Sequence, residues 1–456
     1  MCGIDGGPEL PGPVEVNERG LRVADLDALL ERARYVCNLP ELRNSHVGFV
    51  GYGQTKRGDR VLLAVDTHYD PDIVQAVATA LRERGAHVDV LTVDAGPDRP
   101  FDYLDEIRVT MRRRPWAEEP RRWEGLPWVE ALAEREGYDL LIHGKGGPTP
   151  PTPYRYAQFP WMRRDHFTQG VVVYPQELLA AINQKTWDVI WQKGRGGRIH
   201  LTDPEGTDLT YGLHEDYYDG THYGWEPQPR RVYGHLMAHP TPPLPHADAT
   251  GVVMGTTSHF SRAFRPIRLI LDGGQVQSIE GGDAYGDAWR ALLEESRHTQ
   301  YPCFPRPGLF YLWEAAIGGH PKIQRPHNIE YLSSGGFEWE RRRSGIIHLG
   351  FGTLWRSSDE AWAAERGLLY GHLHVHLLFP TLDVISPNGE VTRIIERGRL
   401  TAMDDPEVRA IAARYGDPDE LLREAWQAPI PGISVAGRYE DYARDPAAWI
   451  YRALRS

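Results

Sequence analysis

Three histidines alternate with apolar residues in the segment Gly-His-Leu-His-Val-His at 371–376, and side chains of this type could bind a metal. Alternate residues of a β-strand lie on the same face, so His372, His374 and His376 would share one face. Each neutral imidazole offers one lone pair and no charge, which suits a divalent metal of intermediate softness. The spacing predicts that at least two of the three are ligands; the alternative is a strand with a solvated polar face.

The composition is that of a globular protein whose main partner is neither a nucleic acid nor a membrane. Its 63 acidic residues against 51 basic ones give a net charge of -12, which disfavours binding to a phosphate backbone. We find no apolar run of membrane-spanning length and no secretion signal. Three cysteines do not make a disulfide framework. We therefore expect a cytoplasmic protein.

The length of 456 residues, together with a change in composition and periodicity near residue 197, predicts two domains, 1–195 and 196–456. The first is expected to be an open parallel α/β domain preceded by an extended arm. A buried strand at 60–66, an amphipathic helix at 72–84 and a buried strand at 88–93 predict two parallel strands joined by a right-handed crossover. The turn after the first strand lacks a glycine-rich fingerprint, so we expect no nucleotide cofactor.

The second domain is expected to be β-rich and to carry the chemistry. Helical periodicity becomes rare after about residue 197, while short apolar runs, glycine and proline become frequent. The predicted strands are 198–203, 252–255, 267–271, 276–279, 346–351 and 372–379. The predicted later helices are 281–295, 405–415 and 418–426.

Several segments, in this order along the chain, resemble a known family. They are the Thr-Asp-Pro-Glu-Gly-Thr-Asp-Leu-Thr segment 202–210, the hairpin 266–282, the Trp-Glu-Ala-Ala-Ile-Gly segment 313–318 and the strand 344–352. Together they resemble the thermophilic metalloaminopeptidases of the aminopeptidase T and S type, which share their fold with 2,5-dihydroxypyridine 5,6-dioxygenase. The resemblance spans about residues 20 to 400. It implies an aminopeptidase T-like α/β fold, a metal site in the second domain and a homodimer.

At two positions where that family carries a carboxylate, this chain carries a histidine. His235 stands where the peptidases carry a glutamate, and His376 stands where they carry an aspartate. Two neighbouring cations need bridging carboxylates to offset their charge, and neutral imidazoles leave too little negative charge for a pair. The exchange therefore predicts one metal ion, held by two or three histidines and at most one carboxylate. Such a site with open positions is typical of non-haem Fe(II) chemistry with dioxygen, although Zn would also fit.

The resulting hypothesis is a mononuclear non-haem Fe(II) dioxygenase acting on a small aromatic or heteroaromatic phenol, with dioxygen as its second substrate. Zn or Mn are the alternative metals. The expected metal ligands are His348, His374, His376 and Glu314, and the expected acid–base groups are His372, His235 and His239. The alternative functions are a metal-dependent hydrolase of the aminopeptidase type and a non-catalytic relative.

Each candidate also has a purely structural interpretation. His348 could be a buried core histidine, and Glu314 could lie on the surface of a helix. His259, after three small polar residues, could contact substrate. Tryptophans near the proposed ligands are expected to pack in the core or to line a pocket for a flat substrate: Trp313, Trp339 and Trp355.

Overall fold

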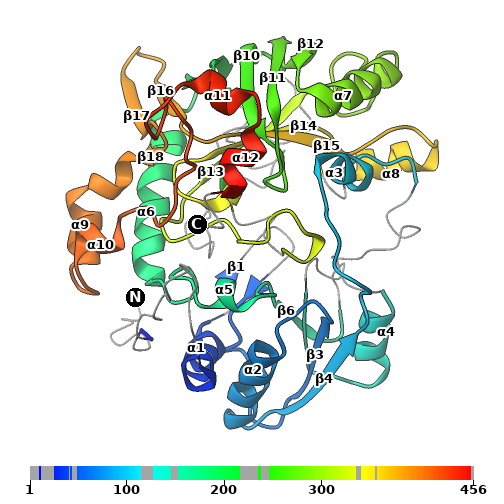
Figure 1. Ribbon diagram of the computed structural model, residues 1–456, viewed down its shortest axis with the longest axis vertical. Helices are drawn as coiled ribbons and strands as arrows, with labels where there is room; N and C mark the ends of the chain where they lie inside the picture. Colours follow the sequence, from blue (N-terminus) through cyan, green and yellow to red (C-terminus); the bar gives the residue numbers. More distant parts are fainter. Residues whose placement is uncertain are drawn as a thin grey trace.

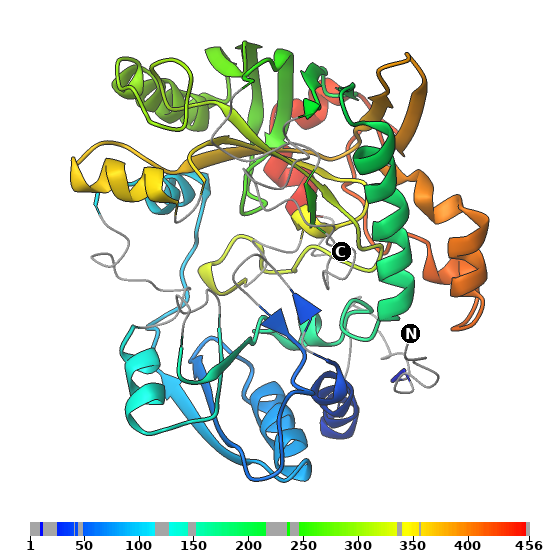
Figure 2. The ribbon, with the colours of Figure 1, turned by 180° about the vertical axis from the view of Figure 1, so that it is seen from behind.

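The computed structural model describes residues 10–11, 25–40, 42–43, 49–114, 127–144, 152–215, 235–237, 246–334, 340–354 and 357–452. These residues form a smaller α/β unit and a larger, β-rich unit, which lie at opposite ends of the molecule (Figure 1). Seen from behind, the same two units are joined along one side by the long helix α6 (Gln176–Asp188) (Figure 2). The α/β fold class predicted from the sequence is confirmed.

The smaller unit is built on a four-stranded parallel sheet in the order β4-β3-β5-β6. Its strands are β3 (Arg60–Asp66), β4 (His87–Val93), β5 (Leu140–His143) and β6 (Arg155–Gln158). Two helices cover one face, α1 (Leu26–Asn38) and α2 (Pro71–Glu83), and α4 (Pro127–Arg135) covers the other. The predicted crossover of parallel strands is confirmed.

The alternation of side chains along β3 explains why helices cover both faces of this sheet. Val61, Leu63 and Val65 pack in the core formed with α1 and α2. Leu62 and Ala64 point the other way and pack with α4. A strand buried on both faces reads as a continuous apolar run, which is why its limits could be predicted from the sequence.

The larger unit contains two antiparallel sheets. One has eight strands in the order β12-β11-β10-β8-β7-β16-β17-β18, and the other has four in the order β15-β14-β13-β9. The strands of the first are β7 (Arg198–Asp203), β8 (Thr207–Gly212), β10 (Thr250–Thr257), β11 (Ala263–Asp272), β12 (Gln275–Gly281), β16 (Thr381–Ile385), β17 (Val391–Glu396) and β18 (Arg399–Leu400). The strands of the second are β9 (His235–Met237), β13 (Leu312–Gly318), β14 (Ile347–Gly352) and β15 (His372–Leu377). A separate pair joins β1 (Leu42–Arg43) to β2 (Phe49–Val50).

The two sheets share one apolar core, which fixes the orientation of the four-stranded sheet. Leu349 and Phe351 of β14, together with Leu373 and Val375 of β15, belong to this core, and β15 packs against β10. Because side chains alternate along a strand, the residues between them must point to the other face of the sheet. That other face carries the histidines singled out in the sequence.

The remaining helices of the larger unit surround its two sheets. They are α3 (Tyr103–Thr110), α7 (Asp283–Ser296), α8 (Ser358–Glu365), α9 (Pro406–Ala412), α10 (Pro418–Leu421), α11 (Tyr439–Ala443) and α12 (Pro446–Arg452). The short helix α5 (Arg164–Phe167) belongs to the smaller unit, where Phe167 joins the core. None of the helices in the described ranges is long and apolar enough to cross a bilayer. The predicted helix 418–426 is shorter than expected, because the Arg399 guanidinium binds the Leu422 carbonyl and the Glu424 carboxylate beyond the end of α10.

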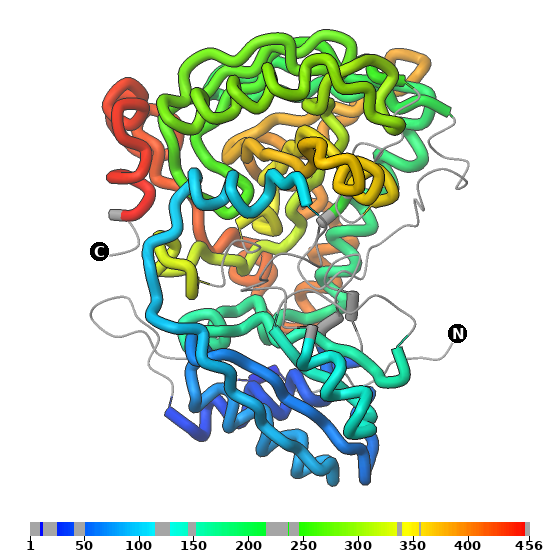
Figure 3. The backbone as a smooth tube through the Cα atoms, turned by 90° about the vertical axis from the view of Figure 1, so that its right-hand side faces the viewer, coloured from blue at the N-terminus to red at the C-terminus, as the bar shows by residue number. Residues whose placement is uncertain are grey.

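Helix α3 comes early in the chain but packs on the larger unit. The chain rises from the smaller unit at about residue 100 and places α3 against the upper part of the molecule (Figure 3). Ile107 and Met111 belong to the core of the larger unit, and α3 contacts α7 and β15. The division of the chain at residue 195 stays a prediction.

A buried acidic pair ties the C-terminal helices to the larger unit. Glu205 accepts hydrogen bonds from Tyr439 Oη at 2.9 Å and from Thr256 Oγ1 at 3.1 Å. Burial, followed by the nearby carboxylate of Asp203, raises the pKa of Glu205 from 4.5 to about 8. The fold therefore favours the protonated form of this carboxyl group.

This raised pKa predicts a loss of stability with rising pH. The contribution of protonated Glu205 is complete below about pH 4.5 and is lost as the pH rises through 8. The variant Glu205→Gln mimics the protonated form, so at pH 9 its free energy of unfolding should exceed that of the native chain by up to about 5 kcal/mol. Denaturant unfolding at pH 5 and pH 9 measures the difference. The exposed Glu134→Gln control should show no such dependence, and an equal response of the two variants would contradict the prediction.

Candidate metal centre

Three neighbouring strands of the four-stranded sheet bring the candidate ligands together. Glu314 lies on β13, His348 on β14, and His374 and His376 on β15. The register pairs His348 with His376, and it pairs Gly350 with both Glu314 and His374. The four side chains therefore occupy two adjacent rungs of the same sheet face. Glu314 lies on a strand whose seven residues are all buried, so its interpretation as a helix-surface residue is wrong.

The donor atoms of these residues face one another at short distances. Glu314 Oε2 lies 3.1 Å from His374 Nε2 and 3.2 Å from His348 Nε2. The other nitrogen of His348, Nδ1, lies 2.8 Å from His376 Nε2. His348, His374 and His376 are fully buried. The result is a compact group of one carboxylate and three imidazoles inside the protein.

A glycine makes the approach of Glu314 and His374 possible. Gly350 stands between them on the middle strand, and a Cβ at this position would lie 2.7 Å from His374 Nε2 and 3.1 Å from Glu314 Oε2. Glycine within a strand interior commonly marks a place where other groups need the space of a side chain. Here the space belongs to the two donor atoms.

A fourth imidazole comes from the eight-stranded sheet. His259 lies in the turn between β10 and β11, and its ring stacks on that of His374, with centroids 4.1 Å apart and an interplanar angle of 22°. From the sequence, His259 was a possible substrate contact and not a candidate ligand. No spacing links it to His348 or His374; the only signal was a histidine directly after an apolar strand and three small polar residues.

Three overlapping sets of donor atoms within the described residues lie close enough to share a metal ion. In each set the atoms lie within 4.8 Å of one another. The sets are Glu314, His348 and His374; His259, His348 and His376; and His259, His372 and His374. All of the ligands expected from the sequence therefore fall in one cluster with His259 and His372.

The protein environment keeps the imidazoles neutral. The pKa values of His348 and His376 lie well below the ordinary value. Burial is the largest cause, and the neighbouring imidazole of His374 is the second. Burial likewise lowers the pKa of His259, and it lowers that of His374 against the opposing effect of Glu314. Neutral imidazoles retain the lone pair that a metal requires.

The donor set fits a bound metal ion. The Nδ1 atoms of His259, His374 and His376 are buried and make no hydrogen bond to any described residue. A buried polar atom without a partner is costly. A cation beside Glu314 would bind the Nε2 lone pairs of His374 and His348, which face the carboxylate oxygen at 3.1 and 3.2 Å. The chemistry of the donors is thus that of a metal site rather than of a packed core.

His372 lies at the partly exposed edge of the cluster. Its Nδ1 lies 3.0 Å from the Thr353 carbonyl oxygen, so this nitrogen carries the proton and Nε2 keeps the lone pair. Burial lowers the pKa of His372 to about 3, so the ring is uncharged at neutral pH. The ring of Trp313 lies 5.2 Å from that of His372. Of the three tryptophans singled out in the sequence, Trp313 alone lies within the described residues.

The other two expected acid–base residues are placed less fully. The backbone of His235 pairs with Gly318 on the edge strand β9, beside the strand that carries Glu314. The side chain of His235 and the whole of His239 lie outside the described part of the chain. Their catalytic role stays a prediction.

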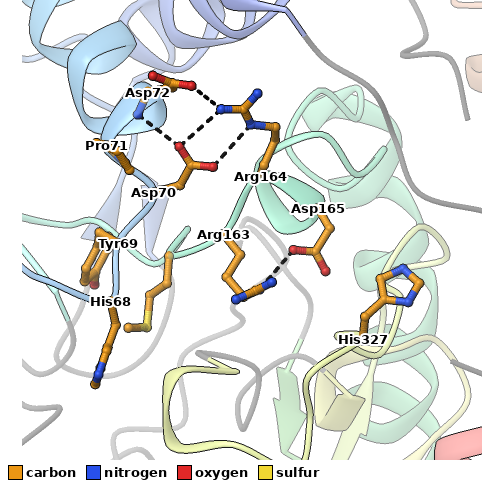
Figure 4. A pocket seen from close by; sticks show the side chains of 10 residues that line it. His68, Tyr69, Asp70, Pro71, Asp72, Arg163, Arg164, Asp165 and His327 are labelled. Atoms are coloured by element: carbon orange, nitrogen blue, oxygen red, sulfur yellow. Dashed lines mark hydrogen bonds and ion pairs between the residues drawn. The ribbon is translucent and has the colours of Figure 1, made fainter. Parts of the chain in front are cut away.

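A second polar site, in the smaller unit, has a different character. A cavity of about 490 Å³ opens where β3 ends and α2 begins (Figure 4). Arg164 pairs with Asp70 and Asp72 there, and Arg163 Nε lies 3.4 Å from Asp165. Its charges largely neutralise one another, and none of its lining residues belongs to a set of donor atoms that could share a metal.

Comparison with known proteins gives distant structural likenesses. No protein-family model and no curated protein sequence matches the chain. The structure of 2,5-dihydroxypyridine dioxygenase from Pseudomonas putida aligns with 85% of this chain and 99% of its own, at 15% identity and a TM-score of 0.46. That of wild-type AmpT from Thermus thermophilus aligns with 82% and 98%, at 16% identity and a TM-score of 0.44. Likenesses this distant carry no argument about the reaction of this chain.

Proposed function

We propose that this chain is a mononuclear non-haem Fe(II) dioxygenase that acts on a small aromatic or heteroaromatic phenol. The observation that carries the proposal is the set formed by Glu314, His348 and His374, whose donor atoms lie within 4.8 Å of one another. Two histidines and one carboxylate on one side of a metal are the ligand set of many non-haem Fe(II) oxygenases. In such a site Fe(II) supplies one-electron chemistry with dioxygen.

The protein residues would divide the remaining tasks. Glu314 supplies the negative charge that partly offsets the cation, and the neutral rings of His348 and His374 complete the set. His372, at the edge of the cluster, keeps an Nε2 lone pair that would accept a hydrogen bond from a phenolic hydroxyl group. Trp313 beside it offers an aromatic surface that suits a flat ring.

A zinc-dependent hydrolase is the second candidate. The set of His259, His348 and His376 contains three imidazoles and no carboxylate, which is a ligand set of catalytic Zn sites. A non-catalytic relative would bind no metal. The metal therefore separates the three functions before any substrate is known.

Metal analysis followed by activity assays tests the proposal. We expect the protein reconstituted anaerobically with Fe(II) to hold about one iron per chain and to consume dioxygen with at least one member of a panel of phenols and hydroxypyridines. The matched assay uses Zn-, Co- or Mn-loaded protein with chromogenic aminoacyl substrates. Activity in the second assay alone would favour the hydrolase. Absence of metal from every preparation would contradict both the dioxygenase and the hydrolase.

Assembly is a separate part of the proposal. The resemblance found in the sequence implies a homodimer, and sedimentation of the purified protein measures its mass directly. A monomer would contradict this part and leave the metal centre untouched.

A further inference from the structure

A buried carboxylate from α3 holds the turn that carries His259. Glu106 is fully buried; its Oε1 accepts a hydrogen bond from the backbone N–H of His259 at 3.0 Å, and its Oε2 accepts one from Phe260 at 3.1 Å. The hydroxyl of Ser258 also donates to Oε2. Three donors of one turn therefore converge on a single side chain from a segment about 150 residues earlier in the chain.

The turn has features that need such support. Ser261 has a φ of 60°, in the left-handed region that is unfavourable for a residue other than glycine. Its N–H bonds the Ser258 carbonyl at 3.0 Å, and the Ser258 hydroxyl accepts a hydrogen bond from the Arg262 N–H at 3.1 Å. Ser258 and Ser261 are fully buried. Without Glu106, the buried N–H groups of His259 and Phe260 would lose their acceptor.

The position of His259 depends on this turn. Its imidazole belongs to two of the three donor sets, stacking on His374 at 4.1 Å and lying 5.1 Å from the ring of His348. The ring extends from the turn between β10 and β11, so the conformation of the turn decides whether the ring reaches the cluster.

We propose that Glu106 is a positioning residue that holds His259 as an additional ligand of the metal centre. This inference rests on the proposed metal site. Glu106 touches no donor atom of the cluster; it acts only through the backbone and hydroxyl groups of the turn. Its effect should therefore be confined to what His259 contributes.

Binding of Co(II) tests the proposal without any substrate. We compare the native chain with Glu106→Gln, with His259→Ala and with the double variant, and we record the Kd for Co(II) and the visible absorption spectrum of the bound ion. Gln turns an N–H donor toward the N–H groups of the turn, so we expect Glu106→Gln to raise the Kd about tenfold. His259→Ala should raise it at least as much and shift the spectrum in the same direction. The double variant should be no weaker than His259→Ala alone.

A matched control separates positioning from general stability. Glu205→Gln alters another buried carboxyl group of the larger unit, one that bonds Tyr439 and Thr256 and lies outside the donor sets. It should leave the Co(II) Kd and spectrum unchanged. A Glu106→Gln protein with native Co(II) binding, or with an effect that adds fully to that of His259→Ala, would overturn the positioning role and leave the metal centre standing. Failure of the native chain to bind Co(II) would overturn the metal centre and this inference together.

A second variant serves if Glu106→Gln does not fold. Ser258→Ala removes one donor to Glu106 and keeps the carboxylate and both backbone bonds. We expect a smaller rise of the Co(II) Kd, by about threefold, with the same direction of spectral shift. An unchanged Kd and spectrum in this variant would count against the proposal.

Discussion

Replacement of His374 by alanine is expected to lower the affinity for Fe(II) by about a hundredfold or more. His374 belongs to two of the three donor sets, and its Nε2 lies 3.1 Å from Glu314. Changing residues that merely orient a ligand typically costs ten- to a hundredfold in metal affinity, so removal of a ligand should cost at least as much. The measurement is a competitive titration of the purified variant with Fe(II) against a chelator of known affinity.

A buried histidine outside the cluster provides the control for this replacement. His320 is fully buried, accepts a hydrogen bond from the Lys322 N–H at 3.1 Å and belongs to none of the donor sets. His320→Ala creates a cavity of similar size, so its melting temperature should fall by a similar amount while Fe(II) binding stays native. If His374→Ala also keeps native affinity, the ion does not lie at this cluster.

The second large effect is expected from a single added methyl group. In Gly350→Ala the new Cβ would lie 2.7 Å from His374 Nε2 and 3.1 Å from Glu314 Oε2, closer than van der Waals contact allows. The two donors must then move apart, and Fe(II) affinity should fall by about a hundredfold. Overpacking should also lower the free energy of unfolding by about 1–3 kcal/mol. Equilibrium metal binding and denaturant unfolding measure the two effects separately.

A glycine of another strand, which faces β15 from its apolar side, gives a matched comparison. A Cβ at Gly255 of β10 would lie 2.5 Å from Val375 Cγ1, so Gly255→Ala crowds β15 from the apolar side. This variant should lose stability to a similar degree and keep its metal. Equal losses of metal affinity in both variants would mean that the sheet as a whole, rather than the space between two donors, controls binding.

The sequence predicted best those elements whose signal is local. The strand 60–66 coincides with β3, and the strand 198–203 coincides with β7. In each case the apolar pattern and the flanking residues lie within the element itself, so no distant partner is needed to recognise it. The same reasoning put the histidines of β15 on one face, because alternation is a property of any extended strand.

Elements whose structure depends on partners far away in the chain were harder to predict from the sequence. The environment of Glu314 was left open between a ligand and a helix-surface residue, because the segment Leu312–Gly318 is apolar on both faces and only its pairing with β14 makes it a strand. Helix α3 was not predicted. Its eight residues are too few for a clear period, and Ile107 is buried in the core of the larger unit.

The residue types of the site were visible in the sequence, and its arrangement was not. The chain by itself determined that three imidazoles lie on one face of a strand and that the protein has an α/β unit followed by a β-rich one. Only the tertiary structure decided which atoms meet. The strand register places Glu314, His348 and His374 on adjacent rungs, and Gly350 leaves the space between two of them. The turn between β10 and β11 places His259 against His374. The physical reason is the distance along the chain over which each feature is determined. Alternation along a strand follows from the backbone of a few consecutive residues, whereas a donor set requires strands and turns far apart in the chain to be fixed by a shared core.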